Sequence, residues 1–228
     1  MDRISSSSPQ QKPSTSATRV MASTIGAIVG LAGIEHGFFE MLQGNVTPSG
    51  LVIDAIGPAQ KLWPGATEPA LTIIPNFFVT GILAMIVGFL VTIWAVTFVQ
   101  RKHGAAVLLL LSFILFLVGG GSPPIFLGII ASVVATRINK PLTWWRAHLP
   151  VNVQDFLAKL WPWSIIAFAL VFWFAVVIAI TGWPLMVFLD ANTTNTLPIL
   201  TLLGYISDGL MFLAVFAGFA YDIQRRSA

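Results

Sequence analysis

Six long apolar runs divide the sequence, and polar or Gly/Pro-rich segments separate them. We place these runs at 20–42, 76–100, 104–118, 123–136, 162–189 and 197–221. A helix of about 20 apolar residues crosses the roughly 30 Å of bilayer hydrocarbon. Because backbone groups find no water partner in lipid, each run should be helical. The pattern predicts an all-α, polytopic integral membrane protein with six transmembrane helices.

Composition excludes the soluble classes of protein. The chain is 56% hydrophobic and 9% charged, with a mean hydropathy of +0.85. Soluble domains are about 45–50% apolar and about 25% charged, so this chain has too few charges to cover a surface in water. A soluble enzyme and a nucleic-acid-binding protein are therefore excluded, and the first expected partner is the lipid bilayer. With no cysteine, disulfides and thiolate metal sites are excluded too.

The basic residues predict the orientation. With six spans, all of them except Lys61 fall on one side of the membrane. They are Arg3, Lys12, Arg19, Arg101, Lys102, Arg137, Lys140, Arg146, Lys159, Arg225 and Arg226. By the positive-inside rule that side is the cytoplasm, and both termini lie there. The layout resembles that of many small bacterial membrane proteins, so we expect a multi-pass protein of a bacterial plasma membrane.

The polar segments define the domain organisation. Residues 1–18 are rich in Ser, Pro and Gln and should form a disordered cytoplasmic tail. Residues 19–222 form the six-helix membrane domain, and 223–228 form a basic cytoplasmic end. A cleaved signal peptide is the alternative for the first span, but that run ends without a small-x-small cleavage site.

Two connections between spans are long. The extracytoplasmic loop 44–75 contains five prolines, and its stretch Ser49–Gly57 could form one short interfacial helix. Such a loop is either a lid or a plug packed on the helix ends. The cytoplasmic linker 138–161 has apolar residues at helical spacing between tryptophans. This pattern predicts an interfacial amphipathic helix in the headgroup plane.

The third and fourth spans are short. The segment GGGSPP at 119–124 separates them, and each has about 14 residues, or about 21 Å of helix. They form either two short spans or a re-entrant hairpin whose tip stops at membrane depth. Gly/Pro-interrupted segments of this kind also occur at transporter binding sites. Charge counting does not separate the two arrangements, because both leave the flanking residues in the cytoplasm.

Four ionisable side chains lie within spans, away from the cytoplasmic ends: Glu35, His36, Glu40 and Asp208. A charged side chain in hydrocarbon costs about 2.5–3.5 kcal/mol on insertion scales, so such residues need partners, protons or a wet cavity. Glu35 and Asp208 each lie about 25 Å along a helix from the nearest cytoplasmic arginine. The first and last spans thus carry carboxyls at one level, in the outer half of the bilayer.

Helical periodicity assigns faces to the first and last spans. The glycines Gly26, Gly30, Gly33 and Gly37 form a stripe typical of close helix packing. Glu40 and His36 point along the same face, whereas Glu35 points to the opposite side. In the last span Tyr205 shares a face with Asp208, and we expect that face to look into the bundle.

These observations give two functional hypotheses. In the first, Glu35, His36, Glu40, Tyr205 and Asp208 line an outward-facing polar cavity. The protein is then a small transporter or channel-like protein for a proton, a cation or a small cationic solute. In the second, it is a non-catalytic accessory, immunity or scaffold protein, which binds a protein partner or a second copy through its outer loop or cytoplasmic linker. Catalytic motifs are absent, so we expect no enzyme and no cofactor; a metal site is disfavoured because His36 is the only histidine in its layer.

Overall fold

The computed structural model describes residues 16–188 and 193–227. Its helices are α1 (Ala17–Leu42), α2 (Phe77–Ile93), η2 (Trp94–Phe98), α3 (Gly104–Leu117), α4 (Ser122–Ala135), α5 (Thr143–His148), α6 (Val151–Thr181), α7 (Leu185–Phe188) and α8 (Thr193–Ser227), with a short η1 (Pro58–Gln60). Two strands, β1 (Val52–Asp54) and β2 (Pro69–Leu71), complete the fold. The all-α prediction is confirmed. The expected tail 1–18 falls mostly outside the described residues, and its last two residues already belong to α1.

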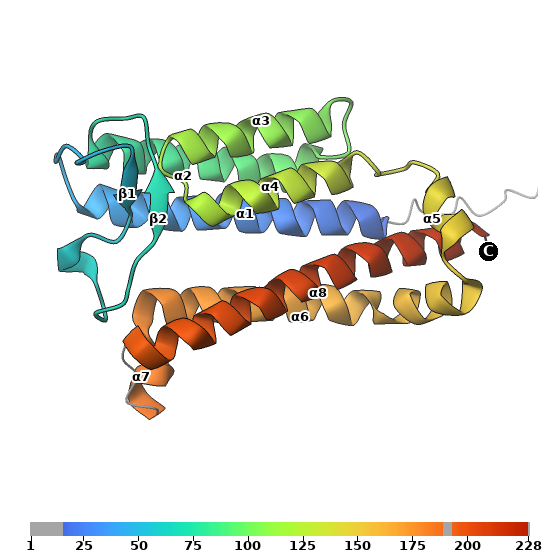
Figure 1. Ribbon diagram of the computed structural model, residues 1–228. Coiled ribbons are helices and arrows are strands. Elements are labelled where there is room, and N and C mark those ends of the chain that lie inside the picture. Colours follow the sequence, from blue (N-terminus) through green and yellow to red (C-terminus); the bar gives the residue numbers. More distant parts are fainter. Residues whose placement is uncertain (1–15, 189–192, 228) are drawn as a thin grey trace, which may run out of the picture.

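Four of these helices are long and apolar enough to cross a membrane: α1, the continuous pair α2–η2, α6 and α8. The helices α3 and α4 are apolar but shorter, with 14 residues each. All of them run roughly parallel or antiparallel to one another (Figure 1). Large apolar side chains on their outer faces, such as Phe89, Leu110 and Leu170, are more than half exposed. An apolar surface of this extent is expected of a protein whose solvent is lipid.

Helix α1 packs against α2 through glycines. A Cβ on Gly88 would lie 2.6 Å from the backbone oxygen of Gly30, and one on Gly37 would lie 2.5 Å from the backbone oxygen of Gly81. Two backbones can approach this closely only where both helices lack side chains, which is how small residues drive helix association in lipid. The predicted packing role of the α1 glycine stripe is confirmed.

The helices form two parts. One part contains α1, α2, α3 and α4, and the other is the antiparallel pair α6 and α8 (Figure 1). One connection between the two parts lies at the end of the molecule where α1 begins and α8 ends. There the carboxylate of Asp222 accepts hydrogen bonds from the backbone N–H groups of Ala17 (2.8 Å) and Thr18 (3.0 Å) and from the Thr18 hydroxyl (2.6 Å). A side chain of α8 therefore caps the N-terminus of α1.

The 44–75 loop covers the opposite end of the molecule. Its strands β1 and β2 are antiparallel, with Ile53 opposite Ala70. Backbone hydrogen bonds continue from β2 to the α3–α4 turn, from Gly119 N to Leu71 O and from Ile73 N to Leu117 O. The prediction of a short helix at 49–57 is wrong. The β-branched residues Val52 and Ile53 favour extended backbone, and they pair with β2 instead.

The other long connection also differs from its prediction. The segment expected to be a separate interfacial helix is the first part of α6, which runs from Val151 through Pro162 to Thr181 without a break. Phe156 is 61% exposed on this segment. The amphipathic first part and the apolar second part of α6 are both compatible with helical spacing. The helix therefore continues through the change in composition at which the sequence suggested a boundary. The short α5 precedes it.

Candidate functional site

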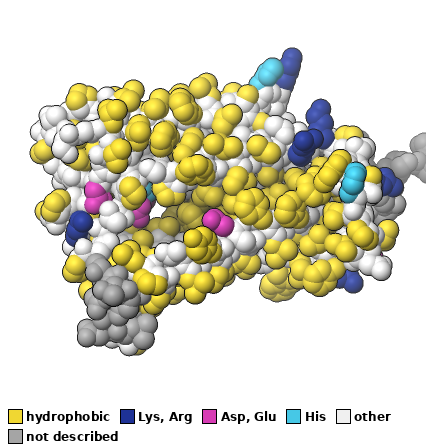
Figure 2. Space-filling model, viewed as in Figure 1, with side chains coloured by type: hydrophobic (Ala, Val, Ile, Leu, Met, Phe, Trp, Pro, Cys, Tyr) yellow, Lys and Arg dark blue, Asp and Glu magenta, His cyan; other side chains and the backbone are white. Residues whose placement is uncertain are grey.

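A cavity of about 550 Å³ separates the two parts of the molecule. Residues of α1 and α4 line one side, and residues of α6 and α8 line the other. Figure 2 shows the molecule hollowed here, with acidic side chains along the hollow. The walls are mostly apolar and include the aromatic side chains of Phe126, Phe172 and Phe212. A largely apolar cavity with a few polar groups is typical of a small-molecule site.

Three ionisable side chains meet at the loop end of the cavity. His36 Nδ1 lies 3.0 Å from Glu35 Oε2, and His36 Nε2 lies 3.1 Å from Glu68 Oε2. One ligand atom from each residue can be chosen so that all three lie within 4.8 Å of one another. His36 is 3% exposed. Here we call Glu35, His36 and Glu68 the Glu–His–Glu cluster.

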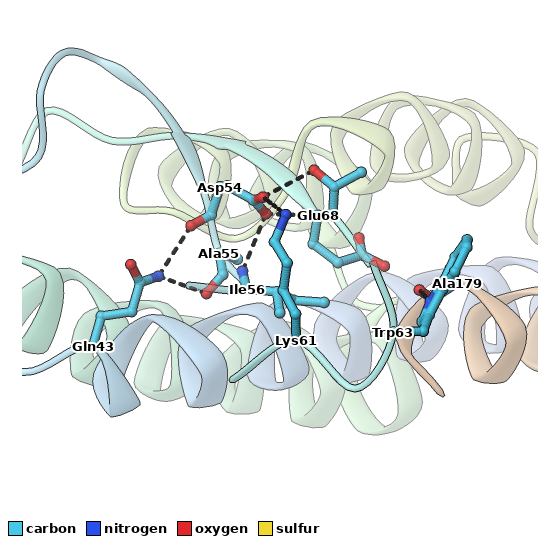
Figure 3. A network of polar contacts seen from close by, with 9 residues as sticks. Gln43, Asp54, Ala55, Ile56, Lys61, Trp63, Glu68 and Ala179 are labelled. Atoms are coloured by element: carbon cyan, nitrogen blue, oxygen red, sulfur yellow. Dashed lines mark hydrogen bonds and ion pairs between the residues drawn. The ribbon is translucent and has the colours of Figure 1, made fainter. Parts of the chain in front are cut away.

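The 44–75 loop holds Glu68 in place through Asp54 (Figure 3). The Asp54 carboxylate accepts hydrogen bonds from Glu68 N (2.8 Å) and Ile56 N (3.2 Å), and it forms an ion pair with Lys61 (3.5 Å). The Gln43 amide, just past α1, donates to the backbone oxygens of Asp54 and Ala55. The loop is thus tied to the helix that carries Glu35 and His36.

A tryptophan anchors the same loop to the other part of the molecule. The indole N–H of Trp63 donates to the backbone oxygen of Ala179 in α6 (2.9 Å), and Trp63 is 2% exposed. Buried Trp63 packs with Ile56 and Ala66, and Phe39 of α1 joins them. The loop therefore bridges α1 and α6 above the cavity. The loop is therefore packed on the helix ends, as in the plug interpretation of the sequence.

Glu40 is fully buried one turn of helix beyond His36. Neither carboxyl oxygen of Glu40 has a hydrogen-bond partner among the described residues. A Cβ on Gly119 would lie 2.5 Å from Glu40 Oε1, and a Cβ on Gly121 would lie 2.5 Å from His36 Nε2. Both glycines have positive φ angles, which suit glycine best. The turn between α3 and α4 thus lies directly against the polar face of α1.

The structure brings some of the expected site residues together and leaves others apart. Glu35, His36 and Asp208 all line the cavity, with Asp208 in the wall formed by α8. Glu40 does not line it. Tyr205 lies outside the lining and is 72% exposed, so the expectation that it faces the bundle is wrong. Helix α8 packs mainly against α6 and less against α1, and this packing leaves Tyr205 uncovered.

Sequence reasoning missed Glu68. It lies in a proline-rich loop without periodicity, so no helical face assigns its direction. The sequence signal that bears on Glu68 is Pro69, because a residue before proline favours extended backbone; this signal indicates local conformation and not a role in a site. Asp54, which positions Glu68, was missed for the same reason.

The described ionisable side chains that line the cavity are three carboxylates and one histidine. Among the described lining residues they are Glu35, His36, Glu68 and Asp208, and no lysine or arginine joins them. Comparison of the chain with protein-family models, curated proteins and solved structures finds no match. Function therefore has to be inferred from the chemistry of the cavity.

Proposed function

We propose that the protein crosses a plasma membrane six times, with both termini in the cytoplasm and the 44–75 loop outside. Apart from Lys61 in the 44–75 loop, the lysines and arginines visible in Figure 2 lie toward the end of the molecule where the C-terminus lies, which agrees with the positive-inside rule. Helices of 14 residues span only about 21 Å. The α3–α4 turn nevertheless reaches Glu40 in the last turn of α1 and pairs with β2, which supports two short crossings.

Within this arrangement the protein is a small transporter- or channel-like protein that takes a small cationic solute from the outer side. The observation that carries this proposal is that three carboxylates, and no lysine or arginine among the described lining residues, face a largely apolar cavity. A cation placed there compensates carboxylates that hydrocarbon would otherwise destabilise. The proposal assigns no catalytic step to these residues.

The cavity walls favour an organic cation with an apolar body. Asp208 supplies a carboxylate in the α8 wall, and Phe126, Phe172 and Phe212 supply aromatic faces. Cation–π contacts of this kind contribute about 0.5–2 kcal/mol each and favour substituted ammonium groups. Asp208 would pair with the charge while the rings contact the substituents.

Uptake of radiolabelled tetraethylammonium into proteoliposomes tests the proposal. Wild-type vesicles should accumulate more of it than protein-free vesicles. Replacing Asp208 by Asn should weaken the binding of tetraethylammonium, and so reduce its uptake, about tenfold or more, because a charge-assisted contact contributes about 1.5–3 kcal/mol. The matched control is Asp155→Asn, the same change on α6 at a position outside the cavity lining. Equal uptake by wild-type and Asp208→Asn vesicles would refute the role of Asp208.

A second candidate function is that of an accessory protein, and the surface of the 44–75 loop favours it. Val46, Leu51, Val52, Leu62 and Ile73 are each more than half exposed there. Exposed apolar patches commonly mark protein or membrane contacts. Replacing Leu51 and Val52 by Thr should abolish cross-linking to a partner or a second copy while leaving tetraethylammonium uptake intact. Unchanged cross-linking would remove this function.

A further inference from the structure

We propose that the Glu–His–Glu cluster is a binding site for a divalent transition-metal ion such as Zn²⁺, with a coordination position open toward the cavity. This inference goes beyond the cationic-solute proposal, because it uses the loop end of the cavity and does not involve Asp208. It also reverses the expectation from sequence, which considered histidines alone and could not place Glu68.

The donor set and its dimensions fit such an ion. Imidazole nitrogen and carboxylate oxygen bind Zn²⁺ at about 2.0–2.2 Å, which places neighbouring ligands of a tetrahedron about 3.4 Å apart. The selected ligand atoms of Glu35, His36 and Glu68 lie within 4.8 Å of one another, and His36 Nε2 is 3.1 Å from Glu68 Oε2. Side-chain rotations that bring the most distant of these atoms closer by up to about 1.4 Å would close the site. Three protein ligands with a fourth position free is an established zinc arrangement.

The orientation of the imidazole independently favours a cation. His36 Nδ1 lies 2.9 Å from the backbone oxygen of Ala32, so Nδ1 is the donor in this contact, and in the neutral imidazole Nε2 then carries the lone pair. This backbone contact is how metal-binding histidines are commonly held. Nε2 then faces an oxygen of Glu68, and two acceptors at 3.1 Å repel unless a proton or a metal ion lies between them.

Unpartnered atoms point to the same place. Glu35 Oε1 and His36 Nε2 are buried atoms for which the described residues supply no hydrogen bond. Buried polar atoms in native proteins are rarely left without a partner. Beside Nε2, Gly121 leaves open the space that a Cβ would fill, 2.5 Å from the nitrogen. Glu35 Oε1 and His36 Nε2 can therefore both act as metal ligands, and Gly121 leaves space beside Nε2.

Charge balance also favours a doubly charged ion. Two carboxylates contribute to the cluster, and the described cavity lining offers no lysine or arginine to offset them. Lys61, the basic residue of the 44–75 loop, forms its ion pair with Asp54 instead. One divalent ion neutralises both carboxylates and leaves Asp208 free for a cationic solute.

Metal binding to tag-free protein in lipid nanodiscs tests the proposal. Co²⁺ is the probe, because it reports its ligands through visible d–d absorption, and Zn²⁺ should displace it. We expect one Co²⁺ per chain and a higher unfolding temperature in its presence. Glu68→Gln and His36→Gln should each weaken Co²⁺ binding about tenfold or more. Asp208→Asn is the matched control and should bind Co²⁺ as wild type does.

Each outcome decides the proposal. Absence of a stoichiometric Co²⁺ band in the wild-type protein would overturn it and leave a proton between His36 and Glu68. Equal Co²⁺ binding by the wild type and both cluster variants would overturn it as well, because the ion would then sit elsewhere, for example at His103 or His148. The wild-type measurement does not depend on the variants folding. Loss of tetraethylammonium uptake in Asp208→Asn with Co²⁺ binding retained would show that the two sites are separate.

Discussion

Substitution of Gly30 by Ala tests the packing of α1 against α2. The added Cβ would lie 2.7 Å from Thr92 N and closer still to the backbone oxygen of Gly88. Non-bonded heavy atoms normally stay about 3.5 Å apart or more, so the two helices would have to separate by about 1 Å. The nearest obstructing atom is the Thr92 hydroxyl oxygen, but the other two, Gly88 O and Thr92 N, belong to the backbone and cannot rotate aside as a side chain could.

The expected cost follows from two opposing effects. Overpacking a close contact typically costs about 1–3 kcal/mol, and a backbone clash belongs at the upper end. Alanine recovers about 1 kcal/mol through its higher helix propensity. The free energy of unfolding should therefore fall by about 2 kcal/mol. Gly209→Ala on α8 is the matched control: nothing lies within 4 Å of its Cβ position, so it should be neutral or slightly stabilising.

Unfolding in mixed detergent micelles, followed by tryptophan fluorescence, measures both variants. Gly30→Ala should unfold at a lower fraction of denaturing detergent than wild type, and Gly209→Ala should not. If the two alanine variants proved equally stable, the glycine contact between α1 and α2 would not have the role assigned to it. A loss of stability in both variants by the same amount would point to the same conclusion.

Three further predictions concern the two ends of the molecule. Asp222→Ala should lower the free energy of unfolding by about 2–4 kcal/mol, because buried N–H groups at the start of α1 lose their acceptor; the same detergent titration measures this, and a neutral effect would contradict the cap. Trp63→Phe keeps an aromatic ring but loses one hydrogen bond, so it should cost about 1 kcal/mol and speed proteolysis of the 44–75 loop; unchanged cleavage would argue against the anchor. Since the chain has no cysteine, Lys61→Cys should react with a membrane-impermeant maleimide in intact cells, whereas Gln100→Cys should react only after lysis; the reverse pattern would invert the topology.

Most of the helical framework was predictable from the sequence. The first run ends at Leu42, as α1 does, and the run 104–118 matches α3 within one residue. These boundaries follow from local chemistry, since apolar runs stop where polar or Gly/Pro residues begin. The contact of Gly30 with α2 was also predictable in kind, because glycines four residues apart on one face favour close packing.

The candidate site was less predictable, because it depends on contacts between distant segments. Glu68 reaches His36 only because β1 pairs with β2 and Asp54 fixes the residue beside it. A periodic pattern of apolar residues indicates neither the pairing of β1 with β2 nor the hydrogen bond from Glu68 N to Asp54. Tyr205 shows the opposite error: helical spacing placed it beside Asp208, but the direction in which α8 packs decides which face is covered.

The cap on α1 sets an order for biosynthesis. Thr18 and Asp222 are 204 residues apart in the chain, and a ribosome adding about 5–20 residues per second needs about 10–40 s to make the stretch between them. Throughout that interval the first helix, with its glutamates and histidine, is in the bilayer or the translocon without the last one. The start of α1 can therefore receive this cap only after the end of α8 has been made, and a protein truncated before Asp222 should be a substrate for membrane quality control.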